Sequence, residues 1–251
     1  MLNNDPIFLA EFPVLETPKA ELALYLFERM AAAKKNVLFF ANTNFIVQCR
    51  PILQRMLNVN ILIVNDGLGM DIAALMLYQH QFQSNLNGTD FIPFFFRLSP
   101  KVLRIFLVGG KQEVINKAAY FLVHKLSQDV VGSCDGYDGI CNHPDLVNVI
   151  NASNAEVVLV AMGNPKQELW ILDHYELLDA KLISGVGALF DFWAGDKPRA
   201  PDLIQKLRME WLYRLCLEPR RLYKRYTIDV VKFLVLCFRY RKKTIQQVDR
   251  S

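Results

Sequence analysis

The sequence predicts an α/β fold, in which a Rossmann-like parallel sheet is covered by helices on both faces and followed by a basic C-terminal helical appendage. Short apolar runs rich in β-branched residues, of which 157–160 is the clearest, alternate with longer segments of helical composition. Strands that are apolar at consecutive positions are typical of parallel sheets buried on both faces. Basic residues are also concentrated after residue 196.

The expected elements follow one another in a regular order. The segment 18–34 is rich in Ala, Leu and Glu, which favour helix. From similar patterns we expect strands at 37–41, 61–64, 104–108, 129–133, 157–160 and 182–186. We expect helices at 46–57, at 70–81, after Gly110 through 126, at 144–152 and from 167. Strands that alternate with helices predict parallel pairing and two helical layers.

The length and composition fit one α/β domain with an appendage. The chain has 251 residues, of which 52% are hydrophobic, so it can bury a full core. The clearest change in composition follows Gly195, where Pro198 and Pro201 introduce the basic segment. We therefore expect a catalytic α/β domain over residues 1–195 and an amphipathic, membrane-associating appendage over 196–251.

Charge divides the chain unevenly. Residues 197–251 hold 15 Lys and Arg and 5 Asp and Glu, a net charge of +10, whereas the remainder carries −6. Aromatic and aliphatic residues are interleaved with these basic residues, which favours an amphipathic element at an anionic membrane surface. A helical hairpin with a solvated basic face fits the same pattern. Nucleic-acid binding is not expected, because no recognised binding motif is present.

Signals for export or membrane insertion are not expected. Asp5 and Glu11 interrupt the amino-terminal segment, which does not resemble a cleavable signal peptide. The longest apolar candidate, 226–238, is too short for a span and is broken by Asp229 and Lys232. The pattern predicts a cytoplasmic protein.

Cysteines and acidic residues show no metal-binding spacing. The five cysteines include no C-x-x-C pair, which indicates reduced thiols and not a disulfide framework. Cys134, Cys141 and His143 lie close in sequence but lack a fourth ligand. No D-x-D occurs, so the chain lacks this pair of neighbouring carboxylates, which is able to hold a divalent ion. We expect no metal and no cofactor.

The segment 161–170 is the most informative in the chain. Its Gly-Asn-Pro ends the strand at 157–160, and Lys-Gln-Glu-Leu-Trp begins a helical pattern. A polar loop at the carboxyl end of a buried parallel strand is where open α/β sheets bind ligands. Gln167 and Glu168 are able to bind hydroxyls or a base edge, with Trp170 packed beneath them. An ordinary strand-to-helix connection with a capping carboxylate fits the segment equally well.

Two polar side chains follow other expected strands. Asp66 comes after the strand at 61–64 and precedes Gly67, which suits a general base beside a close substrate. A turn or helix-capping Asp is the alternative. Asn42 ends the strand at 37–41, where its amide is able to hold a substrate hydroxyl, orient Asp66 or cap a helix. Thr43 is expected to point elsewhere, as in a regular strand.

Glycine-rich turns also follow strands. Gly109 and Gly110 precede Lys111 and offer backbone N–H groups and a helix amino terminus to a phosphate, although a plain tight turn explains them as well. The chain contains no Walker A motif. Gly185 and Gly187 lack the third glycine of a dinucleotide fingerprint, which disfavours a nicotinamide-dependent oxidoreductase.

The segment 161–170 resembles the G-x-P-x-Q-E motif of the WecG/TagA/CpsF glycosyltransferases (glycosyltransferase family 26). Other matching pieces occur in the family's order and cover nearly the whole chain beyond residue 35. They are Asn42, Asn65-Asp66-Gly67, Gly88-Thr89-Asp90, the segments 106–111, 132–137 and 185–192, Gly195, Arg199-Ala200-Pro201, and Glu210 through Arg214. The order and spacing of these motifs together are specific to the family.

The resemblance implies roles for individual residues. The matching Asp in the family is the proposed base that deprotonates the acceptor hydroxyl, which implies this role for Asp66. Asn42 matches the family's active-site Asn, and Asp191 matches an Asp near the nucleotide pocket. Donor groups would be held by Gly109, Gly110, Gln167, Glu168 and Asp191. The family's appendage docks at the membrane and places arginines over the active site, which implies that Arg214, Arg221 and Arg225 meet phosphates.

Two positions depart from the family pattern. Members with T-x-N carry a Thr where this chain has Phe40, and an Arg three residues before G-x-D is replaced by Asn85. An amide does not supply the charge of a guanidinium group. We therefore expect Arg97, Lys101 or arginines of the basic segment to neutralise the leaving diphosphate.

The resemblance implies an inverting hexosyltransferase that forms a β-linkage in exopolysaccharide or cell-envelope glycan synthesis. Its donor would be a UDP-sugar, either UDP-glucose or UDP-N-acetylmannosamine or its uronate, and its acceptor a polyprenyl-diphosphate-linked saccharide. The enzyme would act peripherally at the anionic inner face of the plasma membrane, and a homo-oligomer is compatible with this interpretation. A non-enzymatic membrane-binding module is the remaining alternative, in which Asp66 and Asn42 would be structural.

Overall fold

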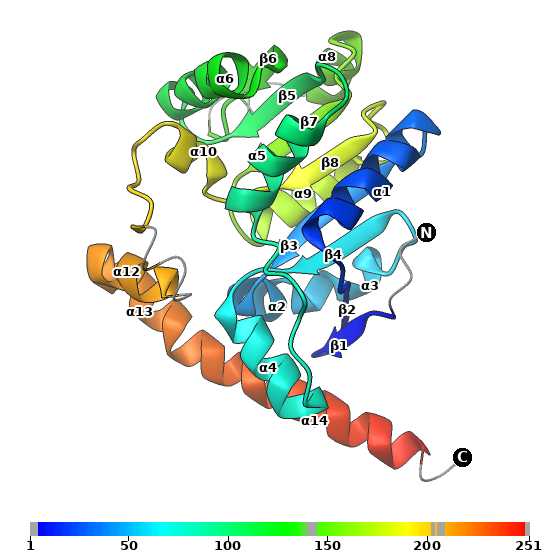
Figure 1. Ribbon diagram of the computed structural model, residues 1–251, viewed down its shortest axis with the longest axis vertical. Coiled ribbons are helices and arrows are strands. Elements are labelled where there is room, and N and C mark those ends of the chain that lie inside the picture. The colour runs from blue at the N-terminus through cyan, green and yellow to red at the C-terminus, as the bar shows by residue number, and fades with distance from the viewer. Residues whose placement is uncertain (1–4, 138, 140–144, 202–203, 205–208, 249–251) are drawn as a thin grey trace.

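The computed structural model describes residues 5–137, 139, 145–201, 204 and 209–248, with the side chains of 221 and 242–248 excluded. A six-stranded sheet lies between two layers of helices, and the carboxyl-terminal helices continue along one side (Figure 1). The predicted fold class is therefore confirmed.

The elements occur in the following order along the chain. The strands are β1 (Ile7–Leu9), β2 (Phe12–Val14), β3 (Asn36–Ala41), β4 (Ile61–Asn65), β5 (Arg104–Gly109), β6 (Asp129–Cys134), β7 (Val157–Ala161) and β8 (Leu182–Gly185). The helices are α1 (Lys19–Ala31), α2 (Thr43–Cys49), η1 (Arg50–Ile52), α3 (Leu53–Met56), α4 (Leu68–Tyr78), α5 (Gly88–Leu98), α6 (Gln112–Leu126), α8 (Leu146–Ala152), α9 (Lys166–His174), α10 (Leu189–Trp193), α12 (Glu210–Leu217), α13 (Pro219–Tyr226) and α14 (Ile228–Val248).

The central sheet has the strand order β4-β3-β8-β7-β5-β6, and every neighbouring pair is parallel. All six strands therefore end at the same edge of the sheet. Open parallel sheets bind ligands beyond this carboxyl edge, because the connecting loops there present polar groups above a rigid base. The topology thus brings the loops after β3, β4, β7 and β8 together.

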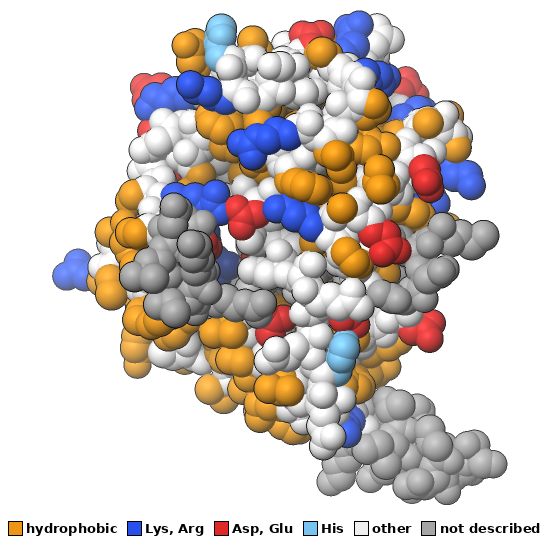
Figure 2. Space-filling model, viewed as in Figure 1, with side chains coloured by type: hydrophobic (Ala, Val, Ile, Leu, Met, Phe, Trp, Pro, Cys, Tyr) orange, Lys and Arg blue, Asp and Glu red, His pale blue; other side chains and the backbone are white. Residues whose placement is uncertain are grey.

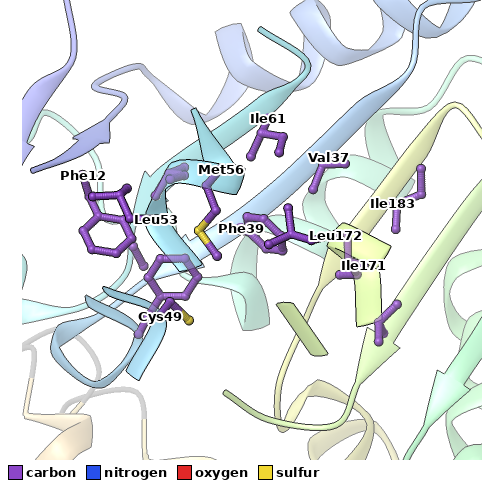
Figure 3. Close-up of a cluster of buried hydrophobic side chains, with 14 of the residues drawn as sticks. Phe12, Val37, Phe39, Cys49, Leu53, Met56, Ile61, Ile171, Leu172 and Ile183 are labelled. Carbon is purple, nitrogen blue, oxygen red and sulfur yellow. The ribbon is translucent and has the colours of Figure 1, made fainter. Parts of the chain in front are cut away.

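Alternate residues of each strand enter two separate cores. On β3, Val37 and Phe39 belong to one buried cluster, and Leu38 and Phe40 belong to the other. Figure 3 shows the first cluster, where Phe39 lies among side chains from β4, β8 and α9. Each fully buried Val, Leu, Ile or Phe side chain contributes about 1.5–3 kcal/mol to folding. This two-sided burial explains why the strands are apolar at consecutive positions.

The two helical layers cover opposite faces of the sheet. Buried side chains from α2, α4, α8, α9 and α14 lie in the first cluster, and those from α1, α5, α6 and α10 in the second. In α14, Phe233 and Cys237 are completely or almost completely buried, and the helix packs against α2 and α4. The carboxyl-terminal segment therefore shares the core of the α/β domain, while a domain boundary at residue 195 stays a prediction.

Several elements differ from the sequence prediction. The helix expected at 46–57 begins earlier, at Thr43, and is divided at Pro51, because proline has no N–H to donate within a helix. Helix α5 was not predicted, since Pro93 lies inside it and resembles a helix breaker. The antiparallel pair of β1 and β2 was also not predicted, because its strands have three residues each. Among the described helices, none is long and apolar enough to cross a membrane.

Candidate active site

A cavity of about 1130 Å³ lies beyond the carboxyl ends of the central strands. Its wall includes the loops that follow β3, β4, β7 and β8, the amino termini of α5 and α9, and parts of α12, α13 and α14. The site residues predicted from the sequence that line it are Asn42, Asp66, Gly110, Gln167, Asp191, Arg214 and Arg225. Tertiary structure thus brings together residues separated by up to about 180 positions in the chain.

Asp66 and Asn42 lie next to each other in this cavity. Asp66 is half-buried directly after β4, and its backbone N–H donates to the carbonyl oxygen of Ala41 at 2.7 Å. Asn42 Nδ2 donates to Asp66 Oδ2 at 3.3 Å. At the same time Asn42 Oδ1 accepts a hydrogen bond from the backbone N–H of Phe45 at 3.1 Å, which caps α2. The capping role and the orienting role of Asn42 therefore coexist.

The surroundings of Asp66 alter its proton affinity. Burial raises the pKa of Asp66, and the positive charges of Arg214 and Arg225 and the hydrogen bond from Asn42 oppose this rise without cancelling it. A carboxylate with a raised pKa at the wall of a cavity holds a proton more readily than one in water. This property suits a general base.

Asn85 fixes the loop that follows Asp66. Its Oδ1 accepts a hydrogen bond from the backbone N–H of Gly67 at 2.8 Å, and Gly67 has a φ of +92°, in the region that favours glycine.

Among the described residues, Arg97 and Lys101 do not line the cavity, whereas Arg214 and Arg225 of the basic segment do. Of the cations considered from the sequence, those of the basic segment therefore reach the cavity.

Asp90 anchors a second polar wall of the cavity at the start of α5. Asn87 Nδ2 donates to Asp90 Oδ2 at 2.8 Å, and Arg199 donates to Asp90 Oδ1. Burial by itself would raise the pKa of Asp90, but these hydrogen bonds and the charges of Arg199 and Lys19 lower it. Asp90 therefore stays ionised and ties the segment around Arg199 to the wall of the cavity.

The two residues of the Gln-Glu pair have different positions. Gln167 lines the cavity although it is only 4% exposed. Its Oε1 accepts hydrogen bonds from the backbone N–H groups of Gly163 at 3.2 Å and Gly187 at 3.0 Å. Glu168 is completely buried and is not among the described residues that line the cavity. Trp170, on the same helix, is partly buried against the first core cluster and stacks on His174.

The glycine turn after β5 places only one of its two glycines at the cavity. Gly110 lines the cavity, and its carbonyl oxygen accepts a hydrogen bond from the backbone N–H of Gly136 at 2.9 Å. Gly109 is not among the lining residues, and a Cβ atom there would lie 2.5 Å from the carbonyl oxygen of Ala161. Gly109 therefore permits close packing of two strand ends, and Gly110 faces the cavity.

Asp191 and the basic helices α12 and α13 form the remaining part of the cavity wall. Lys197 Nζ lies 2.7 Å from Asp191 Oδ2, and both residues line the cavity. On α12, Arg214 lies over the ring of Phe192, with 4.9 Å between the guanidinium carbon and the ring centroid. Arg225 is on α13. Arg221 lies on the same helix, but its side chain is outside the described residues.

Some lining residues were not predicted from the sequence. Glu210 Oε2 lies 3.8 Å from Arg214 Nη2, one helical turn away. Burial raises the pKa of Glu210. The spacing of four residues between opposite charges is a signal that was available in the sequence. Thr43 also lines the cavity, contrary to the expectation that it points elsewhere, because the strand ends at Ala41 and α2 starts at Thr43.

No group of three or more His, Cys, Asp or Glu among the described residues is arranged to hold a metal ion. Cys141 and His143, two of the three residues considered from the sequence, lie outside the described residues. Metal independence of the reaction stays a prediction from the missing D-x-D.

The parallel sheet and the polar cavity at its carboxyl edge define an open-sheet α/β protein with a ligand-binding crevice lined by acidic, amide and arginine side chains. Residues 7–247 match the family described as Glycosyl transferase WecG/TagA/CpsF family, and the chain belongs to this family. It is therefore a glycosyltransferase of cell-envelope glycan synthesis, and its family implies a nucleotide-sugar donor and a glycan acceptor.

Proposed function

We propose that this protein is an inverting hexosyltransferase that moves a sugar from a UDP-sugar to a polyprenyl-diphosphate-linked saccharide and forms a β-linkage. The product would enter exopolysaccharide or another cell-envelope glycan. The observation that carries the proposal is the position of Asp66, a carboxylate with a raised pKa at the wall of the cavity, in contact with Asn42 and near Arg214.

The proposed reaction is a single displacement. Asp66 accepts the proton of the acceptor hydroxyl. At the same time the hydroxyl oxygen attacks the anomeric carbon of the donor sugar, and the bond from that carbon to UDP breaks. Attack from the face opposite the leaving group inverts the configuration at that carbon. Asn42 keeps the Asp66 carboxylate oriented, because its side chain is itself fixed by the backbone of α2.

Arginine side chains are proposed to neutralise the phosphates. Arg214 and Arg225 line the cavity, and their positive charges act on Asp66. Guanidinium groups bind phosphate oxygens in a bidentate manner and remain charged at every physiological pH. We assign the leaving diphosphate to these two residues and extend the assignment to Arg221 from the family resemblance.

The donor sugar is proposed to lie against the loops after β5, β7 and β8. Gly110, Gln167 and Asp191 line this side of the cavity. The donor is UDP-glucose or UDP-N-acetylmannosamine or its uronate. Phe40, where related enzymes carry Thr, also lines the cavity and presents an aromatic ring where a hydroxyl would otherwise be.

We also propose that the enzyme acts at an anionic membrane surface, on the inner face of the plasma membrane. Figure 2 shows apolar side chains gathered over α4 and the adjoining part of α14. On α14, Val231, Val235 and Phe238 are exposed and lie on the side of the helix opposite the buried Phe233. Lys232 is exposed beside this outward face. Ile72 of α4 is exposed too and lines the cavity, so the apolar surface reaches its wall.

The deciding experiment offers a panel of UDP-sugars and a polyprenyl-diphosphate-linked acceptor to the purified protein in detergent. We expect UDP release and a new lipid-linked glycan with one donor of the panel, and neither with Asp66→Asn. Release of UDP without acceptor dependence would indicate hydrolysis in place of transfer. Binding to liposomes with no UDP release from any donor of the panel would favour the non-enzymatic alternative.

A further inference from the structure

A completely buried carboxyl group lies beneath the cavity at the start of α9. Glu168 has no exposed surface, and no other carboxyl side chain among the described residues is enclosed so fully. Its Oε1 accepts hydrogen bonds from Gln167 Nε2 at 2.7 Å and from Asn164 Nδ2 at 2.6 Å. An acceptor in such surroundings holds the amide donors in one orientation, because bulk solvent does not reach the carboxyl group to compete for them.

The orientation of the Gln167 amide matters because its oxygen and its NH₂ group both form hydrogen bonds within the protein. Its oxygen accepts the N–H groups of Gly163 and Gly187, whose φ angles are +75° and +57°. These glycines lie in the loops after β7 and β8. If the amide were rotated by a half-turn, its NH₂ group would face two N–H donors and its oxygen would face Glu168. The hydrogen bond to Glu168 excludes that arrangement.

Asn164 extends the network to a third loop. Asn44 Nδ2, in the first turn of α2, lies 3.4 Å from Asn164 Oδ1. Asn44, Asn164 and Gln167 all line the cavity, whereas Glu168 does not. The NH₂ group of Gln167 has two hydrogens, one of which is donated to Glu168, so at most one remains for a ligand.

We propose that Glu168 is a positioning residue, which fixes the Gln167 amide and through it holds the Gly163 and Gly187 loops in the geometry that binds the donor. The inference rests on the proposed function, since it assigns these loops to the donor side of the cavity. Glu168 itself does not touch the substrate. Its effect is indirect, and a displacement of a binding loop by about 1 Å is enough to lower turnover about 100-fold.

The geometry of the carboxyl group matters here more than its charge. Burial raises the pKa of Glu168, although hydrogen bonds from Gln167, its own backbone and Asn164 oppose the rise. Its Oε2 has no hydrogen-bond partner of normal geometry among the described residues, but the buried Cys49 thiol is close enough to Glu168 to oppose the rise of its pKa as well. A Gln at position 168 therefore keeps an oxygen for both amide donors and places its NH₂ group where Oε2 was, with the sulfur of Cys49 as a weak acceptor. An Asp keeps the charge but is one methylene shorter.

The test compares Glu168→Gln, Glu168→Asp, Glu168→Ala, Gln167→Ala and the double variant Glu168→Ala/Gln167→Ala with the wild type. UDP affinity is measured by calorimetry, and kcat and KM for the donor are measured separately. Asp173→Asn, on the exposed side of the same helix, is the matched control. We expect Glu168→Gln to stay within about threefold of the wild-type UDP affinity and Glu168→Asp and Glu168→Ala to lose about tenfold or more. The double variant should lose no more than Gln167→Ala alone.

Hydrogen exchange of the ligand-free proteins separates this inference from the proposed function. We expect faster exchange in the Gly163 and Gly187 loops of Glu168→Asp and unchanged exchange in Glu168→Gln. Absence of UDP binding by the wild type contradicts the proposed function but leaves this comparison intact. Additive losses in the double variant, or a Glu168→Gln variant weaker than Glu168→Asp, overturn the positioning role. If Glu168→Ala does not fold, the order of the Gln and Asp variants decides.

Discussion

Asn42 Nδ2 lies 3.3 Å from Asp66 Oδ2, so the side chain that caps α2 also contacts the carboxylate that follows β4. Two neighbouring parallel strands end at these residues, and the strand register pairs Ala41 with Asn65 immediately before them. Helix capping and carboxylate orientation are therefore coupled in one amide.

Replacement of Asp66 by Asn should abolish transfer and leave UDP binding intact. The amide keeps the size of the side chain but does not accept a proton, and loss of a positioned general base costs about 100-fold to 10,000-fold in rate. Initial rates with the defined acceptor and UDP affinity by calorimetry measure the two effects. Asp129→Asn, an exposed change at the opposite edge of the sheet, should match the wild type. Near-wild-type turnover of Asp66→Asn would rule out the assigned base.

Substitution of Asn42 should separate its two roles. Asn42→Ser keeps a side-chain oxygen at the helix cap but is too short to reach Asp66, so we expect lower activity at nearly unchanged stability. Asn42→Ala should lose activity and also about 1 kcal/mol of folding free energy, the typical value of a helix cap. Chemical denaturation and initial rates measure both quantities. Equal activity of Asn42→Ser and the wild type would assign Asn42 to capping alone.

Stability should depend on pH through Asp66. Because burial raises the pKa of Asp66 in the folded protein above its unfolded value, its protonation stabilises the fold. This contribution is complete below the unfolded pKa and is lost as the pH rises through the folded pKa. Asp66→Asn should therefore melt at a higher temperature than the wild type at pH 7, and the difference should disappear below about pH 4. A variant less stable than the wild type at pH 7 contradicts this direction.

Transfer activity should survive an excess of EDTA. The sequence lacks the D-x-D pair that holds a divalent ion in metal-dependent transferases, and arginines are proposed to take that role. The measurement is the initial rate after incubation with EDTA and removal of the chelated metal. Complete loss that is restored by Mn²⁺ or Mg²⁺ would reveal a metal requirement.

Membrane binding should have an electrostatic component, which salt weakens, and a hydrophobic component, which salt does not weaken. Lys232→Gln with Arg239→Gln should reduce binding to anionic liposomes, because each basic residue near such a surface contributes about 1 kcal/mol. Val231→Ser with Val235→Ser should reduce the binding that persists at high salt, because these apolar side chains are exposed on α14.

Co-sedimentation with neutral and anionic liposomes at several salt concentrations measures both components. Val59→Ser is a matched control, since Val59 is a highly exposed valine at the amino end of β4, away from the cavity. If both double variants bind like the wild type, the outward face of α14 is not the membrane contact.

The sequence alone was sufficient for the fold class and the order of most elements. Consecutive apolar positions at 37–41 and 157–160 indicated strands buried on both faces, and β3 and β7 have that burial. The family was also accessible, because its motifs occur in order along the chain and residues 7–247 match it. These features depend on local composition and spacing, which are visible without the tertiary structure.

The partners of the site side chains were decided only by the tertiary structure. Gln167 and Glu168 are adjacent in sequence, yet one lines the cavity and the other is completely buried, because successive residues of a helix point in different directions. Asn85, at the position of the missing family Arg, bonds to the backbone of Gly67. Phe233 of the basic segment lies in the core beneath α2 and α4. Contacts between residues far apart in the chain depend on how the elements pack, and a single sequence does not encode that packing in any local pattern.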